Sequence, residues 1–180
     1  MTAPADRDLI LRARRGEADA FGELVTRYQT EVFNVCYRML NERGEAEDLA
    51  QEAFIRAYGR LGSFDVERPF GPWIRRVAAN LCFNHFSARP AIAAELDEER
   101  DAARSSGPEA AYEDRERSAQ IRRALAGLPP QYRVAIELRH YQEMSYDEIA
   151  ETMGIPLSDV KSHLFRARKL LAEKLSHASF

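Results

Sequence analysis

The helical spacing of its apolar residues is the feature that most constrains what this chain can fold into. Within the first ninety residues, large apolar side chains recur at steps of three and four along residues 21–39, 49–61 and 70–85. No stretch shows the alternation that is typical of a strand. Each such helix must bury its apolar face, and three or four of them can bury one another. The pattern therefore predicts an all-α bundle over residues 1–88.

The composition changes after this block. Residues 91–118 hold nine acidic residues and four arginines, and Pro90, Pro108 and the Ser105-Ser106-Gly107 run interrupt the segment. Few large apolar residues, a net negative charge and helix breakers are typical of a flexible linker. We predict such a linker over residues 89–116, with alanine-rich parts that could form a short helix when docked on a partner.

A second helical block is predicted over residues 117–180. Ser145 and Glu148 have the spacing of a capping box, and Gly154 suits a left-handed helix end. A longer helix follows and runs past Leu175. A short helix, a turn with glycine and a longer helix are typical of a helix-turn-helix. We therefore expect an all-α chain of two small helical domains joined by a flexible acidic linker, the second domain being a helix-turn-helix.

The last predicted helix has one face that core packing does not explain. At 100° per residue, Val160, Leu164 and Ala167 fall on a narrow apolar arc. The opposite face carries basic, hydroxyl and aromatic side chains: Lys161, Ser162, Phe165, Arg166, Arg168 and Lys169. This combination suits a DNA major groove, because cations meet phosphates and guanine edges and a phenyl ring meets a thymine methyl. The alternative is a solvated basic face, which leaves Phe165 unexplained.

A similar anomaly occurs on the helix predicted from residue 70 onward. Trp73, Asn80 and Asn84 share one edge of the helical wheel, with Arg76 beside them. The preceding loop, residues 62–70, contains a proline and two phenylalanines. Aromatic rings stack on unpaired bases, and amides hydrogen-bond to base edges. The pattern fits equally well if the tryptophan anchors the core and the asparagines cap nearby loops.

Charge and missing motifs narrow the possible functions. The net charge is −3, so the chain should bind DNA weakly by itself, and any DNA role must be local or need a partner. The four histidines are scattered with no cysteine pair nearby, so we expect no metal and no cofactor. Phosphate-binding and serine-nucleophile motifs are missing too. An enzyme with a small-molecule substrate is therefore not expected.

Two further features bear on the compartment. The sequence has no apolar segment of signal-peptide or membrane-spanning length, so we expect a cytoplasmic protein without membrane insertion. Cys36 and Cys82 both fall on apolar helix faces. Buried free thiols are favoured over a disulfide or redox pair.

Three ordered segments resemble a known family. Asp48–Tyr58 resembles the polymerase-binding helix of sigma factors, and Pro72–Asn80 with Asn84 resembles the promoter-melting segment of their extracytoplasmic-function group. Leu128–Arg168 resembles that group's C-terminal helix-turn-helix. The likeness covers about residues 8–87 and 117–175. Response regulators also carry such a helix-turn-helix, but after an α/β receiver domain, and the first ninety residues show no βα alternation.

The resemblance implies a bacterial promoter-recognition subunit of RNA polymerase, with roles for three groups of residues. One group would dock on the β′ clamp helices of core polymerase: Asp48, Gln51, Glu52 and Arg56. A second would engage the non-template strand of the −10 element: Phe64, Phe70, Trp73, Arg76, Asn80 and Asn84. A third would face the −35 element: Lys161, Ser162, His163, Phe165, Arg166 and Arg168. The implied partners are core polymerase (β′ clamp helices and β flap), promoter DNA and an anti-sigma factor, and polymerase itself would supply the catalysis.

Many members of the family carry arginine where this chain has Lys161 and His163. Lysine does not make the bidentate guanine contact of arginine, so the upstream sequence that is read should differ. Two alternatives stay open at this point. One is a stand-alone helix-turn-helix repressor or activator, and the other is an adaptor that never touches DNA. Only a sigma factor should bind core polymerase and start promoter-specific transcription.

Overall fold

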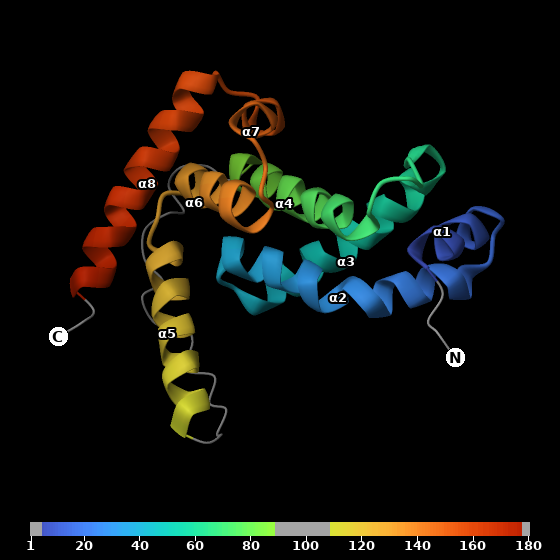
Figure 1. Ribbon diagram of the computed structural model, residues 1–180, viewed down its shortest axis with the longest axis horizontal. Helices are drawn as coiled ribbons and strands as arrows, with labels where there is room; N and C mark the ends of the chain where they lie inside the picture. The colour runs from blue at the N-terminus through green and yellow to red at the C-terminus, as the bar shows by residue number, and fades with distance from the viewer. Residues whose placement is uncertain (1–4, 89–108, 178–180) are drawn as a thin grey trace.

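The computed structural model describes residues 5–88 and 109–177, and the regular structure in those ranges is helical throughout (Figure 1). The N-terminal unit consists of α1 (Asp6–Arg14), α2 (Ala18–Leu40), α3 (Arg43–Arg60), the 3₁₀ turn η1 (Leu61–Ser63) and α4 (Phe70–Ala88). The C-terminal unit consists of α5 (Glu109–Ala126), α6 (Pro130–Ile136), the π-helical turn η3 (Glu137–Tyr141), α7 (Tyr146–Met153) and α8 (Leu157–His177). The predicted all-α fold is confirmed.

The predicted apolar stripes form the core of the N-terminal unit, where α2 packs against α1, α3 and α4. Leu24, Val32 and Ile74 have no exposed surface, and each such side chain contributes about 1.5–3 kcal/mol on burial. Tyr58 is an exception. We expected it on the buried stripe of the second helix, but 48% of it is exposed, because its ring lies edge-on against Phe21 at the margin of the bundle.

Both cysteines lie inside this unit as buried free thiols, as predicted. Cys36 comes from α2 and Cys82 from α4. A hydrogen bond with Cys36 and burial together raise the pKa of the Cys82 thiol. The pair therefore behaves as a neutral apolar contact between two helices. No helix within the described ranges is long and apolar enough to cross a bilayer.

In the C-terminal unit, α7 begins and ends where the sequence predicts. The Ser145 hydroxyl accepts a hydrogen bond from the Glu148 N–H and the Glu148 carboxylate accepts one from the Ser145 N–H, so the capping box is confirmed. Gly154 ends α7 with a φ of 65°, in the left-handed region that glycine adopts without strain. On α8, Val160 and Leu164 are fully buried and form the apolar arc expected from the helical wheel.

A wide turn interrupts the path from α6 to α7. The Gln142 N–H donates to the Glu137 carbonyl at 3.1 Å, which is the i to i+5 pattern of a π-helix. The Met144 N–H donates to the Leu138 carbonyl at 3.0 Å, and Glu143 takes a positive φ of 54°. The turn directs Glu137 toward the N-terminal unit, and its sequence gave no signal of this winding.

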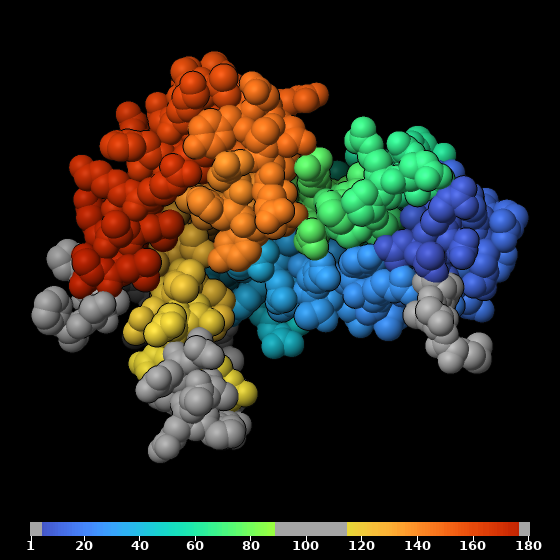
Figure 2. All heavy atoms as spheres, in the orientation of Figure 1, coloured from blue at the N-terminus to red at the C-terminus, as the bar shows by residue number. Residues whose placement is uncertain are grey.

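The two units pack against each other, which the sequence did not predict. α6, η3 and α7 contact α4, while α5, α6 and η3 contact α2, and the space-filling view shows the two surfaces in direct contact (Figure 2). α5 begins at Glu109, so it extends into the segment expected to be a linker, where glutamate and alanine favour a helix. The rest of that linker, residues 89–108, lies outside the described residues.

Candidate polymerase and nucleic-acid interfaces

The four residues assigned to polymerase docking lie together on the outer face of α3. Asp48 and Gln51 are exposed, and the Arg56 guanidinium donates to the Glu52 carboxylate at 2.7 Å. Ile55 lies between them in the same stripe and is 66% exposed. Ile55 was not among the residues predicted for this face. Its only signal was an apolar residue that falls off the apolar stripe, and an exposed apolar side chain ringed by polar groups suits a protein contact.

The edge of α4 forms a hollow of about 210 Å³. Asn80 and Asn84 are exposed along it, and Arg56 and Arg60 of α3 bring positive charge to the same hollow. Thr152 of α7 also lines it. The hollow thus brings two exposed amides together with two guanidinium groups, a combination suited to base edges and phosphates.

The aromatic residues before and within α4 form one cluster. Phe70 has no exposed surface, and its ring centroid lies 5.9 Å from that of Phe64 and 5.5 Å from that of Trp73. Phe64 is only 7% exposed, whereas Trp73 is half-buried. Of these three rings, Trp73 alone has much surface to offer a base. In this arrangement Phe64 and Phe70 support the Trp73 ring from the buried side.

Arg76 lies on the same helix but is already engaged. Its guanidinium donates to the carboxylate of Glu148 in α7 at 3.4 Å, with 38% of its side chain exposed. Its Nε is buried and makes no hydrogen bond within the part of the chain that the structure describes. Arg76, the one cation assigned to the −10 strand, is thus bound by the C-terminal unit through only part of its guanidinium group.

The outer face of α8 carries the third group. Phe165 is 69% exposed and therefore lies outside the core, with Lys161, Ser162 and Arg168 exposed around it. The Arg166 guanidinium donates to the Tyr132 hydroxyl at 3.4 Å, and this hydrogen bond raises the pKa of Arg166.

His163 differs from the other residues of that group. It is half-buried, with its ring centroid 5.2 Å from that of Tyr132, so it offers less surface than its neighbours. Nearby His140 is exposed. Partial burial, followed by the charges of Arg168 and Arg139, lowers its pKa. Both histidines therefore lie beside a strongly basic face.

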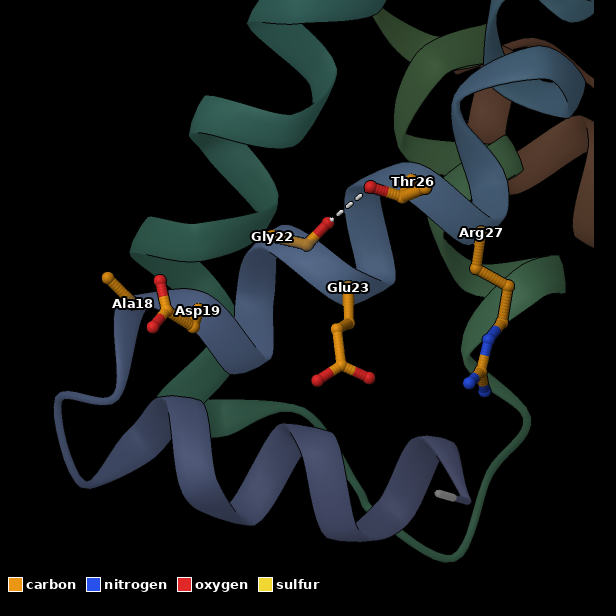
Figure 3. Close-up of a pocket in the computed structure, with 6 residues that line it drawn as sticks. All are labelled: Ala18, Asp19, Gly22, Glu23, Thr26 and Arg27. Carbon is orange, nitrogen blue, oxygen red and sulfur yellow. Dashed lines mark hydrogen bonds between the residues drawn. The ribbon is translucent and has the colours of Figure 1, made fainter. Parts of the chain in front are cut away.

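A second hollow lies along the first turns of α2. It measures about 660 Å³, and its lining comes from one side of α2: Ala18, Asp19, Gly22, Glu23, Thr26 and Arg27 (Figure 3). The Thr26 hydroxyl donates to the Gly22 carbonyl at 3.0 Å and so is turned back onto its own helix. Across residues 5–88 and 109–177, no three His, Cys, Asp or Glu side chains gather as metal ligands would.

Comparison with known families decides the identity of this architecture. Residues 24–90 match the model for sigma-70 region 2, and residues 118–171 match the model for sigma-70 region 4. The ECF RNA polymerase sigma factor SigW of Bacillus subtilis is 36% identical over 176 residues, covering 92% of this chain and 94% of that protein. This chain belongs to the extracytoplasmic-function group of the sigma-70 family. It is a promoter-recognition subunit of RNA polymerase with no catalytic role of its own, and the resemblance seen in the sequence is confirmed.

Further relatives agree. The ECF RNA polymerase sigma-E factor of Escherichia coli is 37% identical over 180 residues and covers 94% of each chain. The solved structure of CnrH in complex with the cytosolic domain of CnrY aligns over 98% of this chain and all of that one, with 26% identity and a TM-score of 0.62. The sigma factor RpoE of Bartonella quintana, solved with the anti-sigma factor NepR, shares the fold at 20% identity and a TM-score of 0.63.

Proposed function

We propose that this sigma factor carries its contacts on three separate helical faces. The α3 face docks on the β′ clamp helices of core polymerase, the α4 edge and its loop capture the non-template strand of the −10 element, and the outer face of α8 reads the −35 duplex. Residues 1–88 would then form the −10 module and residues 117–180 the −35 module. The supporting observation is that the residues of each assigned group belong to one helix and its adjoining loop, with exposed members on three different helices.

The mechanism requires no bond chemistry from this chain. Docking of α3 delivers the sigma factor to polymerase, and α8 sets the register on duplex DNA through basic groups and Phe165. Trp73, Asn80 and Asn84 then bind bases that have left the helix. Unstacking costs a few kcal/mol per base, so capture of unpaired bases lowers the cost of opening the promoter.

Two further partners belong to the same proposal. The C-terminal unit would meet the β flap of polymerase, and an anti-sigma factor would hold the free protein. The second idea is supported by CnrH, which was solved with the cytosolic domain of a second protein. It is also supported by this chain's own exposed apolar residues on α3 and α8, which a partner could cover.

A titration against core polymerase tests the docking face. Asp48→Lys and Glu52→Lys should each weaken binding by about 1–2 kcal/mol, roughly 5- to 30-fold, because each reverses a charge at the interface. Glu23→Lys, which reverses an exposed acid on α2, serves as the matched control and should bind normally. Promoter-specific transcription by the reconstituted holoenzyme provides the second readout. Normal affinity in both α3 variants would contradict the assignment of this face.

A further inference from the structure

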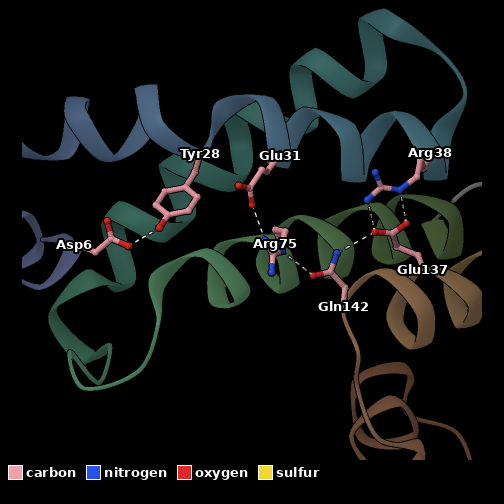
Figure 4. Close-up of polar contacts among 7 residues, drawn as sticks. All are labelled: Asp6, Tyr28, Glu31, Arg38, Arg75, Glu137 and Gln142. Carbon is pink, nitrogen blue, oxygen red and sulfur yellow. Dashed lines mark hydrogen bonds and ion pairs between the residues drawn. The ribbon is translucent and has the colours of Figure 1, made fainter. Parts of the chain in front are cut away.

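A polar network joins the C-terminal unit to α2 and to α4, the helix that carries the proposed −10 surface (Figure 4). The Arg38 guanidinium of α2 donates two hydrogen bonds, each of 2.9 Å, to the Glu137 carboxylate of η3. Glu137 is only 3% exposed, and the Gln142 amide donates to it at 3.0 Å. Burial lowers the pKa of Arg38, but the hydrogen bonds and charge of Glu137 outweigh it and the net effect raises the pKa. The network is therefore a built contact with oriented, charged partners.

The same network reaches the arginines of α4. The Arg75 Nε donates to the Gln142 side-chain carbonyl at 3.3 Å, and its terminal nitrogen donates to Glu31 of α2 at 2.6 Å. Arg76 donates to Glu148. Oxygen atoms of the C-terminal unit thus lie where oxygen atoms of a DNA backbone would bind an arginine.

The neighbouring hollow is shared in the same way. Asn80 and Asn84 line it from α4, and Thr152 closes it from α7. A base that enters this hollow must displace α7 or share the space with it. Charge and shape therefore agree: α7 engages Arg76 and borders the hollow that the exposed amides of Asn80 and Asn84 line.

We infer that the C-terminal unit is an internal ligand of α4 and competes with the unpaired promoter strand for it. Glu148 and Gln142 take the place of phosphate and base oxygens, so the free chain partly occupies its own proposed −10 surface. The inference rests on the role proposed above for the α4 edge. It adds that this edge becomes fully available only when α7 leaves it.

The contact between the C-terminal unit and α2 and α4 can break as well as form. A buried ion pair such as Arg38–Glu137 contributes little net free energy, because both groups regain water when the units separate. The Arg76–Glu148 pair is already 38% and 44% exposed on its two side chains, and Arg76 Nε has no hydrogen bond among the described atoms. A phosphate-rich strand can satisfy that guanidinium better than one carboxylate does.

Two substitutions in the full chain test the inference. Glu148→Gln removes the charge that faces Arg76 but keeps a capping residue, because glutamine serves at this position of a capping box. Gln142→Ala removes the acceptor of Arg75. The matched control is Glu151→Gln, the same change at an exposed acid on the same helix. Circular dichroism should show unchanged helix content in every variant.

Two readouts follow at a single salt concentration, since phosphate contacts weaken as salt rises. X-ray scattering should give a larger radius of gyration for the Glu148→Gln/Gln142→Ala protein than for the wild type and the control. The probe for binding is a fluorescent single strand, taken from the non-template −10 region of a promoter that the holoenzyme transcribes. Its affinity for the double variant should rise about 3- to 10-fold, because the competent open form becomes more populated.

The outcomes separate the inference from the function on which it rests. Equal affinity of the double variant and the wild type overturns the inference, and so does a radius of gyration that does not change. If Asn80→Ala still weakens binding of the strand in either case, the proposed role of the α4 edge survives. If Asn80→Ala has no effect on the strand or on promoter opening, both ideas fall together.

Discussion

The α4 edge and the outer face of α8 carry similar side chains in different situations. Each has arginine, an aromatic ring and small polar groups, yet the arginines of α4 meet Glu148 and Gln142, while Phe165 and its basic neighbours face solvent. The proposed duplex-reading face is therefore open to solvent, whereas the arginines of the proposed strand-capturing edge are occupied by the C-terminal unit. This difference teaches that residue types define what a surface can bind, whereas packing between units defines when it can bind.

Replacing one aromatic residue of the α4 edge and one of the α8 face should give the largest difference in stability. Phe70→Ala deletes a fully buried ring that touches Tyr28, Phe64 and Trp73, and should lower the free energy of unfolding by about 3–5 kcal/mol. Phe165→Ala deletes an exposed ring and should change it by less than about 0.5 kcal/mol. Urea denaturation measures both. A large loss for Phe165→Ala would mean that this ring belongs to the core.

Replacing each of two similarly exposed apolar residues with alanine should separate DNA binding from polymerase binding. Phe165 and Ile55 are 69% and 66% exposed, on α8 and α3. Phe165→Ala should weaken duplex promoter binding by about 1–3 kcal/mol, roughly 5- to 150-fold, and leave core polymerase binding unchanged. Ile55→Ala should do the reverse. Fluorescence anisotropy measures both kinds of binding. A variant that weakens duplex binding and polymerase binding to a similar degree would contradict the separation.

Asn80→Ala should give a smaller effect that appears only after the strands separate. Binding to closed duplex should stay close to the wild-type value, because the proposed ligand of this amide is an unpaired base. Promoter opening should slow severalfold, by roughly the loss of one hydrogen bond. Permanganate footprinting of thymines measures the opening. A loss of duplex binding as large as that of Phe165→Ala would contradict the division between the two faces.

The smallest effect should be a pH dependence of the α7 contact. Hydrogen bonds from Ser145, with a lesser contribution from Arg76, hold the pKa of Glu148 below the usual value of 4.5. A carboxyl with a depressed pKa adds stability above its unfolded pKa, and that stability is lost as the pH falls through the folded pKa. The melting temperatures of wild type and Glu148→Gln should therefore differ slightly near neutrality and converge below about pH 4.

Glu151→Gln is the control for this last measurement, since it removes an acid from the same helix without touching Arg76 or the capping box. A gap between wild type and Glu148→Gln that widens toward acid would show that the carboxylate destabilises the folded chain. That result would remove Glu148 as a stabilising partner of Arg76 and leave the Arg75–Gln142 hydrogen bond as a remaining polar contact between α4 and the segment before α7.

Local patterns predicted most of the fold and the exposure of several candidate site residues. The capping box at Ser145 and the left-handed Gly154 depend on residues a few positions apart, and so both were predictable. The wheel placed Phe165 outside the core for the same reason. The pairing of Arg38 with Glu137 was not predictable, because it joins two units across a segment that carries no pattern. Phe64 and Phe70 were expected to meet DNA, but the loop turns both rings inward.

The π-helical turn at Glu137–Tyr141 places one extra residue of chain at the point where the C-terminal unit meets α2. A π turn holds about one residue more than an α turn for the same full rotation, so deleting one residue there should restore regular winding and leave the direction of the following helices nearly unchanged. A deletion within the regular helix α6 has no such reserve and should rotate everything that follows by about 100°. Glu137 and Glu148 would then no longer face Arg38 and Arg76. A change of chain length should therefore be tolerated in η3 but not in α6, where it would redirect the proposed −35 face of α8.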